Sequence, residues 1–272
     1  DKPIYRCNVV AICGDAGSGK STLADMLKKC FSNSSTLECD RYHKWERNDE
    51  NWNKFTHLNP DANYIKRMNS DIFDLKIGKS VYCVGYNHSK GKFTEKEKID
   101  KSDNIIVCGL HSLYSKNHGV YNLKIFIDTD INLKTKWKVK RDTTERGYSA
   151  SDVLRQIKSR MADYYKYVYP QRESSDVIIN FFTDEEFSLN KIDEEGAVYL
   201  RMLINKKYSL LNVLIAMQKK NIKFDFITNN DRFNEITFSE YKKCDLLEGS
   251  DGHLNGYYDY IGFIILSLNG NT

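Results

Sequence analysis

The stretch Gly14-Asp15-Ala16-Gly17-Ser18-Gly19-Lys20-Ser21 fits the pattern G-x-x-x-x-G-K-[ST] of a phosphate-binding P-loop. Residues 8–13 precede it as a short apolar run of strand length. Residues 22–31 follow it, with apolar side chains spaced along one helical face. A strand, a glycine-rich loop and a helix in this order are the context in which the pattern binds phosphate. The sequence therefore predicts a site for a nucleoside triphosphate.

The residue types in this loop suit the binding of phosphate. Its glycines lack Cβ atoms, so the backbone can curl and direct its N–H groups at phosphate oxygens. The start of the following helix adds positive dipole character. We expect Lys20 to reach the β- and γ-phosphates and Ser21 to offer its hydroxyl to Mg²⁺. The residues expected to bind ATP are Gly14, Asp15, Ala16, Gly17, Ser18, Gly19, Lys20, Ser21 and Thr22.

Buried strands alternate with helices along the chain. Apolar runs at residues 104–108, 123–128 and 176–180 are typical of strands covered on both faces. This alternation predicts an α/β fold of the P-loop NTPase type, with three layers and a mainly parallel sheet flanked by helices. We expect residues 1–183 to form this core and residues 184–272 to form a C-terminal α+β elaboration of unknown role.

Several segments have more specific expectations. Residues 80–84 are predicted to form a strand, followed by a Lys- and Gly-rich loop. In the C-terminal part, residues 198–219 are predicted to be helical, and residues 223–228 and 235–238 to be strands. The run at residues 261–266 fits a buried strand or a helix segment, and residues 249–256 read as a glycine-rich turn.

Composition narrows the class of protein. The 272 residues are 40% hydrophobic and 29% charged, which is typical of a globular protein, and no apolar run approaches the ~18 residues of a membrane span. The net charge of +4 is mild and its cations are interleaved with acids, so a nucleic-acid surface is not indicated. We expect a cytoplasmic protein. Because the first residue is Asp1 rather than Met, we also expect either a trimmed sequence or one domain of a longer chain.

The seven cysteines contain no C-x-x-C pair, so a zinc site is not indicated. Most lie in or beside apolar runs, which predicts reduced thiols in the core of a cytosolic protein. The alternative is a redox pair between Cys13 and Cys39, both expected near strand ends beside the phosphate site.

Polar residues follow the ends of the expected strands, where ligands collect in α/β sheets. A second short strand is expected at residues 36–39; Asp40 ends it, and His43 and Arg47 lie in the loop that follows. A kinase that phosphorylates an alcohol needs a carboxylate near the acceptor hydroxyl and cations on the transferring phosphoryl group. Asp40 fits the carboxylate by position. Arg141 and Arg146 fit a lid, over residues 141–172, that would exclude water on closing.

A set of segments resembles the phosphoribulokinase/uridine kinase family of P-loop kinases and follows the family order. They are residues 14–22, 38–47, 58–63, 78–80, 86–88, 109–111, 140–147 and 170–178. The Asp-x-Tyr-His loop at residues 40–43, Tyr-Asn-His at 86–88 and Gly-Leu-His at 109–111 resemble the phosphoribulokinase branch more than the uridine kinase branch.

The resemblance implies an ATP- and Mg²⁺-dependent kinase with an alcohol acceptor, in carbohydrate metabolism. It implies that Asp40 is the general base, that Lys20 is catalytic, and that Ser21 and Asp40 hold Mg²⁺. The residues implied to contact a phosphorylated sugar or the transferring phosphate are His43, Arg47, His88, Lys138, Arg141 and Arg146. His88 has the alternative of touching a nucleobase. Asp142 is expected to be an ion-pair partner in a helix rather than a catalyst.

Three functions stay open. The cluster of arginines suits an anionic acceptor, of which ribulose 5-phosphate is the best known in this branch. A uridine/cytidine-type kinase is the second reading, and a nucleotide-binding regulatory domain is the third. A small-molecule substrate is expected in the first two cases. Related kinases are often oligomers, so a homo-oligomer is a further expectation, although no stripe of residues identifies an interface.

Cys108 departs from the family pattern. The family usually has an acidic residue at this strand end, and that acid helps to hold the Mg²⁺ shell. A neutral thiol cannot replace its charge, because Mg²⁺ prefers hard oxygen ligands. Either Asp40 and Ser21 suffice with a nearby carboxylate such as Asp15 or Glu38, or activity is reduced, or the domain binds nucleotide without turning it over.

Overall fold

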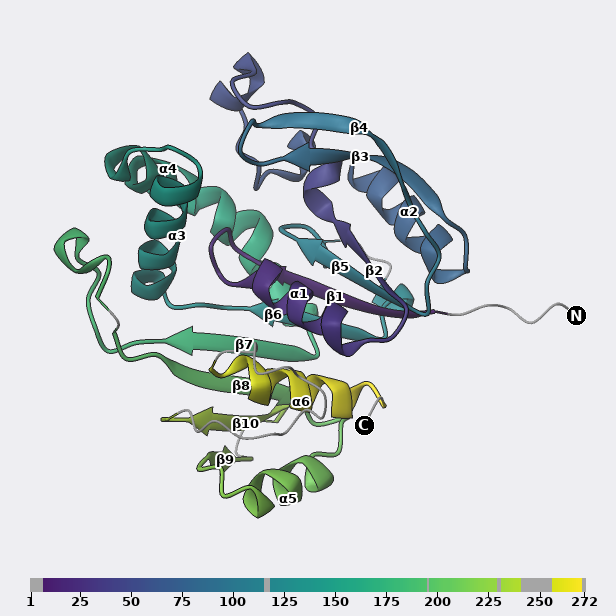
Figure 1. The fold of residues 1–272 in the computed structure, drawn as a ribbon, viewed down its shortest axis with the longest axis vertical. Helices are drawn as coiled ribbons and strands as arrows, with labels where there is room; N and C mark the ends of the chain where they lie inside the picture. Colours follow the sequence, from purple (N-terminus) through teal and green to yellow (C-terminus); the bar gives the residue numbers. More distant parts are fainter. Residues whose placement is uncertain (1–6, 115–117, 195, 229–230, 241–255, 271–272) are drawn as a thin grey trace, which may run out of the picture.

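The computed structural model describes residues 7–114, 118–194, 196–228, 231–240 and 256–270. Within these residues eight strands form one sheet, in the spatial order β2 (Ser34–Glu38), β5 (Asn104–Gly109), β1 (Asn8–Gly14), β6 (Leu123–Ile127), β7 (Val177–Phe182), β8 (Tyr199–Asn205), β10 (Phe233–Phe238) and β9 (Asp225–Ile227) (Figure 1). The first five strands of this order are parallel, and each of the last three is antiparallel to its neighbour. The sheet is therefore mainly parallel.

Helices cover both faces of the sheet, as the alternating pattern predicts. They are α1 (Lys20–Cys30), α2 (Ile65–Lys76), α3 (Ile131–Glu145), α4 (Ala150–Asp163), α5 (Leu211–Lys219) and α6 (Tyr258–Leu268). On one face, buried residues of α1 and α6 share a core with β1, β6 and β8. On the other face, α2 packs against β5 and the Cys39–Tyr42 turn. The prediction of an α/β fold with a mainly parallel, helix-flanked sheet is confirmed.

A separate hairpin stands beside the main sheet. It pairs β3 (Val81–Asn87) with β4 (Lys92–Ile99), with a register shift between Val84 and Tyr86. The strand expected near residues 80–84 is present, but the expected loop after it contains a strand. β4 is charged and almost wholly exposed, so it lacks the apolar pattern by which a buried strand is recognised.

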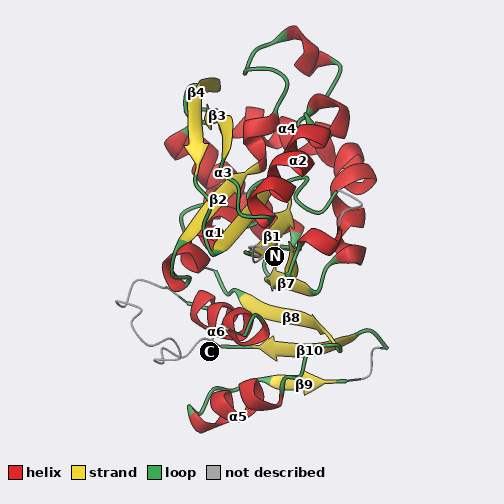
Figure 2. Cartoon of the chain, turned by 90° about the vertical axis from the view of Figure 1, so that its right-hand side faces the viewer, coloured by secondary structure: helices red, strands yellow, loops and turns green. Residues whose placement is uncertain are grey.

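The C-terminal strands continue the main sheet away from β1 and toward α5 (Figure 2). The prediction of a helix over residues 198–219 is wrong in its first part. Residues of β8 alternate between buried and half-buried, and they pair with β7, whereas the helix α5 begins only at Leu211. The strands expected near residues 223–228 and 235–238 are present as β9 and β10.

The remaining C-terminal expectations have mixed outcomes. The run at residues 261–266 lies in α6, so the helical reading is the correct one. The turn expected at residues 249–256 lies almost wholly outside the described residues. The division of the chain at residue 183 stays a prediction. Among the described residues, no helix is both long and apolar enough to cross a membrane.

A close approach between β5 and the chain after β2 fixes the position of Asp40. A Cβ atom built on Gly109, the last residue of β5, would lie 2.3 Å from the Cβ atom of Cys39. A separation this short is impossible for two side chains, so only glycine fits here. The short helix Cys39–Tyr42, which carries Asp40, is therefore held directly against the end of β5.

We predict that Gly109→Ala destabilises the protein by about 1–3 kcal/mol, because the added methyl group must push Cys39 out of a packed core. The free energy of unfolding in urea measures this. Gly119→Ala is the matched control, because a Cβ at Gly119 would meet nothing within 4 Å. If the two variants had equal free energies of unfolding, the backbone around Cys39 would be able to move enough to accept the methyl group, and the prediction would be wrong.

Candidate functional site

The predicted P-loop lies between β1 and α1 and is held by hydrogen bonds within the loop and from Thr129. The buried Ser18 hydroxyl donates to the Asp15 carbonyl at 2.8 Å, and the Thr129 hydroxyl donates to the Ser18 carbonyl at 2.9 Å. The Lys20 ammonium reaches back across the loop and donates to the same Asp15 carbonyl at 2.5 Å. The loop thus holds the lysine where an incoming phosphate would compete for it.

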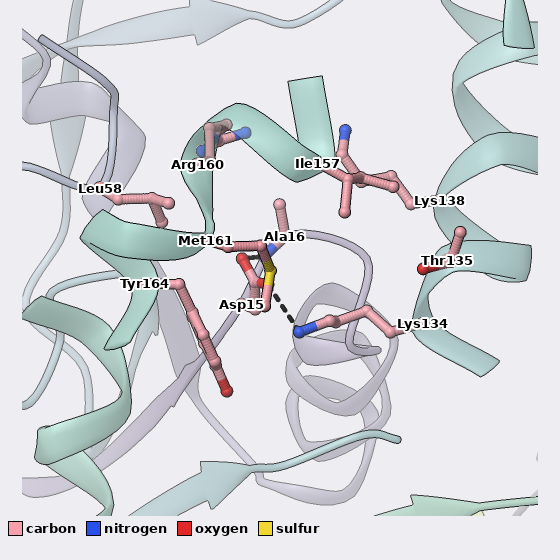
Figure 3. Close-up of a pocket in the computed structure, with 10 residues that line it drawn as sticks. All are labelled: Asp15, Ala16, Leu58, Lys134, Thr135, Lys138, Ile157, Arg160, Met161 and Tyr164. Carbon is pink, nitrogen blue, oxygen red and sulfur yellow. Dashed lines mark hydrogen bonds and ion pairs between the residues drawn. The ribbon is translucent and has the colours of Figure 1, made fainter. Parts of the chain in front are cut away.

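A small hollow opens beside the P-loop, under the helices α3 and α4 (Figure 3). Its lining residues are Asp15, Ala16, Leu58, Lys134, Thr135, Lys138, Ile157, Arg160, Met161 and Tyr164. Asp40 does not line it, so the hollow forms only part of the site. The helix α4 belongs to the predicted lid, and its closure over phosphates stays a prediction.

An ion pair ties the P-loop to α3. The Lys134 ammonium lies 2.8 Å from the Asp15 carboxylate and 4.3 Å from the centre of the Tyr164 ring (Figure 3). Burial raises the pKa of Asp15, but Lys134 and Arg160 lower it more, so the pKa lies below its ordinary value. Asp15 is therefore an ionised partner of Lys134.

Asp40 lies between two histidines. Its carboxylate oxygens are 3.4 Å from His43 Nε2 and 3.3 Å from His88 Nε2. Burial would raise the pKa of Asp40, but His43, His88 and Lys20 lower it to about 2. The carboxylate is therefore ionised at neutral pH and able to accept a proton. Of the residues that the sequence assigned to the acceptor side of the site, the structure places His43 and His88 against Asp40.

The hydrogen bonds of Asn63 determine which nitrogen of His43 carries the proton. The Asn63 amide nitrogen donates to the carbonyls of His57 and Asn59, so its oxygen is left to accept. That oxygen lies 2.7 Å from His43 Nδ1, which must therefore carry a hydrogen. The Nε2 atom then faces Asp40. This explains why a segment as distant as residues 58–63 matters to the site.

Arg47 holds the hairpin that carries His88. Its guanidinium donates to the carbonyls of His88 and Ser89, and it lies 5.3 Å from the centre of the Tyr148 ring. Burial lowers the pKa of His88 below its ordinary value, although Asp40 opposes this, so His88 is neutral at physiological pH. Arg47 is thus engaged with the backbone, and a contact to phosphate would have to compete with these bonds.

Asp142 gathers the three cations of α3 and the turn after it. Its carboxylate lies 2.5 Å from Lys138 Nζ, 2.7 Å from the Arg141 guanidinium and 3.4 Å from that of Arg146. Asp142 is 1% exposed. Its pKa is raised by burial but lowered more by Lys138 and Arg141, and it lies below its usual value. One carboxylate cannot neutralise three cations, so the cluster keeps an excess of positive charge that suits an anion.

Arg160 is a charged residue of the site that the sequence did not single out. It lines the hollow, and its buried Nε atom has no hydrogen-bond partner among the described residues. Burial lowers its pKa, while the carboxylates of Asp15 and Asp40 raise it. No motif marks Arg160, because only the packing of α4 over the P-loop brings it here.

The oxygen donors present fit Mg²⁺, although they are few. Ser21 and Asp40 offer hard oxygen ligands, and Mg²⁺ usually keeps several waters and binds phosphate oxygens as well. No group of three or more acidic, cysteine or histidine side chains is placed to hold a metal among the residues that the structure describes. Cys108 adds no charge, because burial raises its pKa to about 12 against the opposing effect of Lys20.

Cys13 and Cys39 are both free, buried thiols in the structure. Burial raises the pKa of Cys13 to about 11 and raises that of Cys39 well above its ordinary value. Protonated thiols are poor nucleophiles, so these raised pKa values do not favour a redox pair between Cys13 and Cys39.

We predict that Asp142→Asn destabilises the protein by about 1–3 kcal/mol at pH 7, because it leaves three cations without a counter-charge. Since the folded pKa is depressed, this stabilisation is present above the unfolded pKa of about 3.9 and is lost as the pH falls through the folded pKa. Urea unfolding at pH 7 and at pH 3 measures the difference. Asp193→Asn is the control, because Asp193 pairs with Lys140 on the exposed side of α3 at 3.4 Å. If the difference in unfolding free energy between the wild type and Asp142→Asn were as large at pH 3 as at pH 7, the charge argument would be wrong.

Known proteins resemble this chain in sequence. It is 30% identical over 222 residues to phosphoribulokinase of Synechocystis sp., which covers 80% of this chain and 62% of the relative. It is 31% identical over 219 residues to the chloroplastic phosphoribulokinase of Spinacia oleracea, covering 73% and 54%. A uridine-cytidine kinase A of Dictyostelium discoideum is 30% identical over 193 residues, covering 67% and 38%. The chain thus spans only part of each relative's length.

A solved structure and a family model extend the comparison. Phosphoribulokinase from Rhodobacter spheroides has the same fold, with a TM-score of 0.67 and 20% identity over 86% of this chain and 91% of that one. The model described as "Phosphoribulokinase / Uridine kinase family" matches residues 9–188, which is more than half of the chain. That match includes the P-loop, Asp40 and the cations around Asp142, and the chain belongs to the phosphoribulokinase/uridine kinase family.

Proposed function

We propose that this protein transfers the γ-phosphoryl group of ATP to a hydroxyl group of a sugar phosphate or a related polyol. The observation that carries the proposal is that one site contains both an ionised Asp40 and an excess of cations around Asp142. An ionised carboxylate suits the removal of a hydroxyl proton, and the cations suit an acceptor that already bears a phosphate. Several relatives are phosphoribulokinases, which supports this acceptor class.

The proposed reaction balances as a direct transfer. The acceptor oxygen forms a bond to the γ-phosphorus as the bond to the bridging β,γ-oxygen breaks, and Asp40 takes the hydroxyl proton. ADP leaves, and Asp40 later releases the proton to water. Lys20, freed from the Asp15 carbonyl, neutralises charge on the phosphates. When bound, Mg²⁺ would supply charge neutralisation at the β- and γ-oxygens, held by Ser21 and Asp40.

Binding of an anionic acceptor would also strengthen Asp40 as a base. With a pKa of about 2, the ligand-free carboxylate is a weak proton acceptor. The negative charge of a phosphate on the acceptor would oppose the effect of Lys20 and raise this pKa. A neutral nucleoside would not, so the charge around Asp40 favours the sugar phosphate over the uridine/cytidine-type acceptor.

We predict ADP release with Mg-ATP and one phosphorylated acceptor, and a loss of about 10²–10⁴-fold in Asp40→Asn, because general base catalysis typically contributes this much. The panel is ribulose 5-phosphate, other pentose and polyol phosphates, free sugars, uridine and cytidine. ADP binding should survive the substitution. Turnover confined to uridine or cytidine would favour the nucleoside kinase, and ADP binding without turnover would favour the regulatory domain.

Glu38 is the carboxylate that we propose in place of the acid absent at Cys108. Glu38 and Cys108 are register partners on the neighbouring parallel strands β2 and β5, so their side chains point to the same face of the sheet. Asp15, the other candidate, is neutralised by Lys134. The Glu38 side chain is half exposed, and its carboxylate lies 3.9 Å from Arg41 Nε, which is longer than a hydrogen bond. The carboxylate is therefore accessible to a hydrated ion.

We predict that Glu38→Gln raises the Mg²⁺ concentration needed for half-maximal binding of Mg-ADP by about tenfold, and that Glu38→Gln/Cys108→Glu restores it. Titration of Mg²⁺ into protein with ADP measures this without turnover. Glu97→Gln is the control, since Glu97 also pairs with Arg41, at 3.1 Å. An unchanged Mg²⁺ requirement in Glu38→Gln would remove Glu38 from the metal site.

A further inference from the structure

The C-terminal helix α6 brings a tyrosine hydroxyl to the P-loop. Tyr258 is the first residue of α6, and a Cβ atom built on Gly19 would lie 2.6 Å from its hydroxyl oxygen. Thr22 lies close enough to lower the pKa of the same hydroxyl, against the larger opposing effect of burial. Gly19 and Thr22 bracket the first turn of α1, whose N–H groups face the phosphates in a P-loop. The hydroxyl therefore lies at the rim of the predicted phosphate site.

Packing holds Tyr258 in this place. Ile261, Ile264 and Ile265 of α6 are fully buried in the core that α6 shares with α1. The ring of Tyr258 lies 5.5 Å from that of Phe181 in β7, centre to centre. A buried helix and a ring contact at its first residue fix the direction in which the hydroxyl can reach.

The chemistry of a phenol suits this position. A tyrosine hydroxyl can accept a hydrogen bond and still donate its own proton to a ligand. Burial raises the pKa of Tyr258 to about 12, so the hydroxyl keeps its proton at physiological pH. A neutral donor beside a glycine at a φ of +98° can approach a phosphate that sits against the loop backbone.

We infer that Tyr258 is a nucleotide-binding residue, whose hydroxyl donates a hydrogen bond to a phosphate oxygen of the nucleotide at the P-loop. The helix α6 then completes a site whose other residues lie within 9–188, the segment matched by the family model. This gives a role to a part of the chain in which sequence motifs indicate none. The inference rests on the proposed binding of ATP.

Isothermal titration with ADP tests the inference. Tyr258→Phe keeps the ring against Phe181 and removes only the hydroxyl, so we expect the Kd for ADP to rise about 5–20-fold. Tyr257→Phe is the matched control, because the hydroxyl of this preceding residue donates to the Phe238 carbonyl at 3.5 Å. We expect its Kd to stay within about twofold of the wild-type value, as for a contact remote from the ligand.

Two further measurements separate this role from others. We expect Tyr258→Phe to weaken the binding of tripolyphosphate, which carries phosphates without a nucleoside, by the same factor as the binding of ADP. The unfolding midpoint of this variant without ligand should match that of the wild type. Equal Kd values for the two variants, a loss confined to ADP, or a loss matched by a lower midpoint would each overturn the inference. Lys20→Ala is the reference for the P-loop itself. If the wild-type protein bound ADP no better than Lys20→Ala, the proposed function would fail instead.

Discussion

Parallel strands end at the same edge of a sheet, and the candidate site depends on this constraint. The end of β1 leads into the P-loop, the end of β2 into the turn that carries Asp40, and the end of β5 lies against that turn at Gly109. The strand β6 then leads into α3, from which Lys134 reaches back to Asp15. Groups that are far apart in the sequence become neighbours because the strands that precede them lie side by side.

Much of this core could be predicted because its patterns are local. The glycine-rich loop and the continuous apolar runs of β1 and β5 depend on residues that are adjacent in the chain. The errors occur where the pattern is weak. β4 is a charged strand that depends on pairing with β3. The alternating residues of β8 come shortly before the helical residues of α5, so the two patterns are hard to separate. Pairing partners decide such segments, and a single sequence does not display them.

The site shows the same division between local and distant information. Asp40, His43 and His88 do come together, as the resemblance implied, and Asp142 is the ion-pair partner that its helical spacing predicted. Arg160 could not be found this way, because its role depends on how α4 packs over the P-loop. The amide of Asn63, which sets the tautomer of His43, depends equally on tertiary contacts.

The electrostatics of Asp40 connect binding to chemistry. Lys20 helps to keep its carboxylate ionised, and the charge of this lysine makes the carboxylate a weaker base while the site holds no anion. The cations around Asp142 exceed what one carboxylate neutralises, so they gain most by binding a negatively charged ligand. An acceptor that brings a phosphate would relieve this excess and reduce the positive potential at Asp40. Its own charge would thus raise the basicity of the carboxylate that we propose as its proton acceptor, so that a correct acceptor would activate the site on binding.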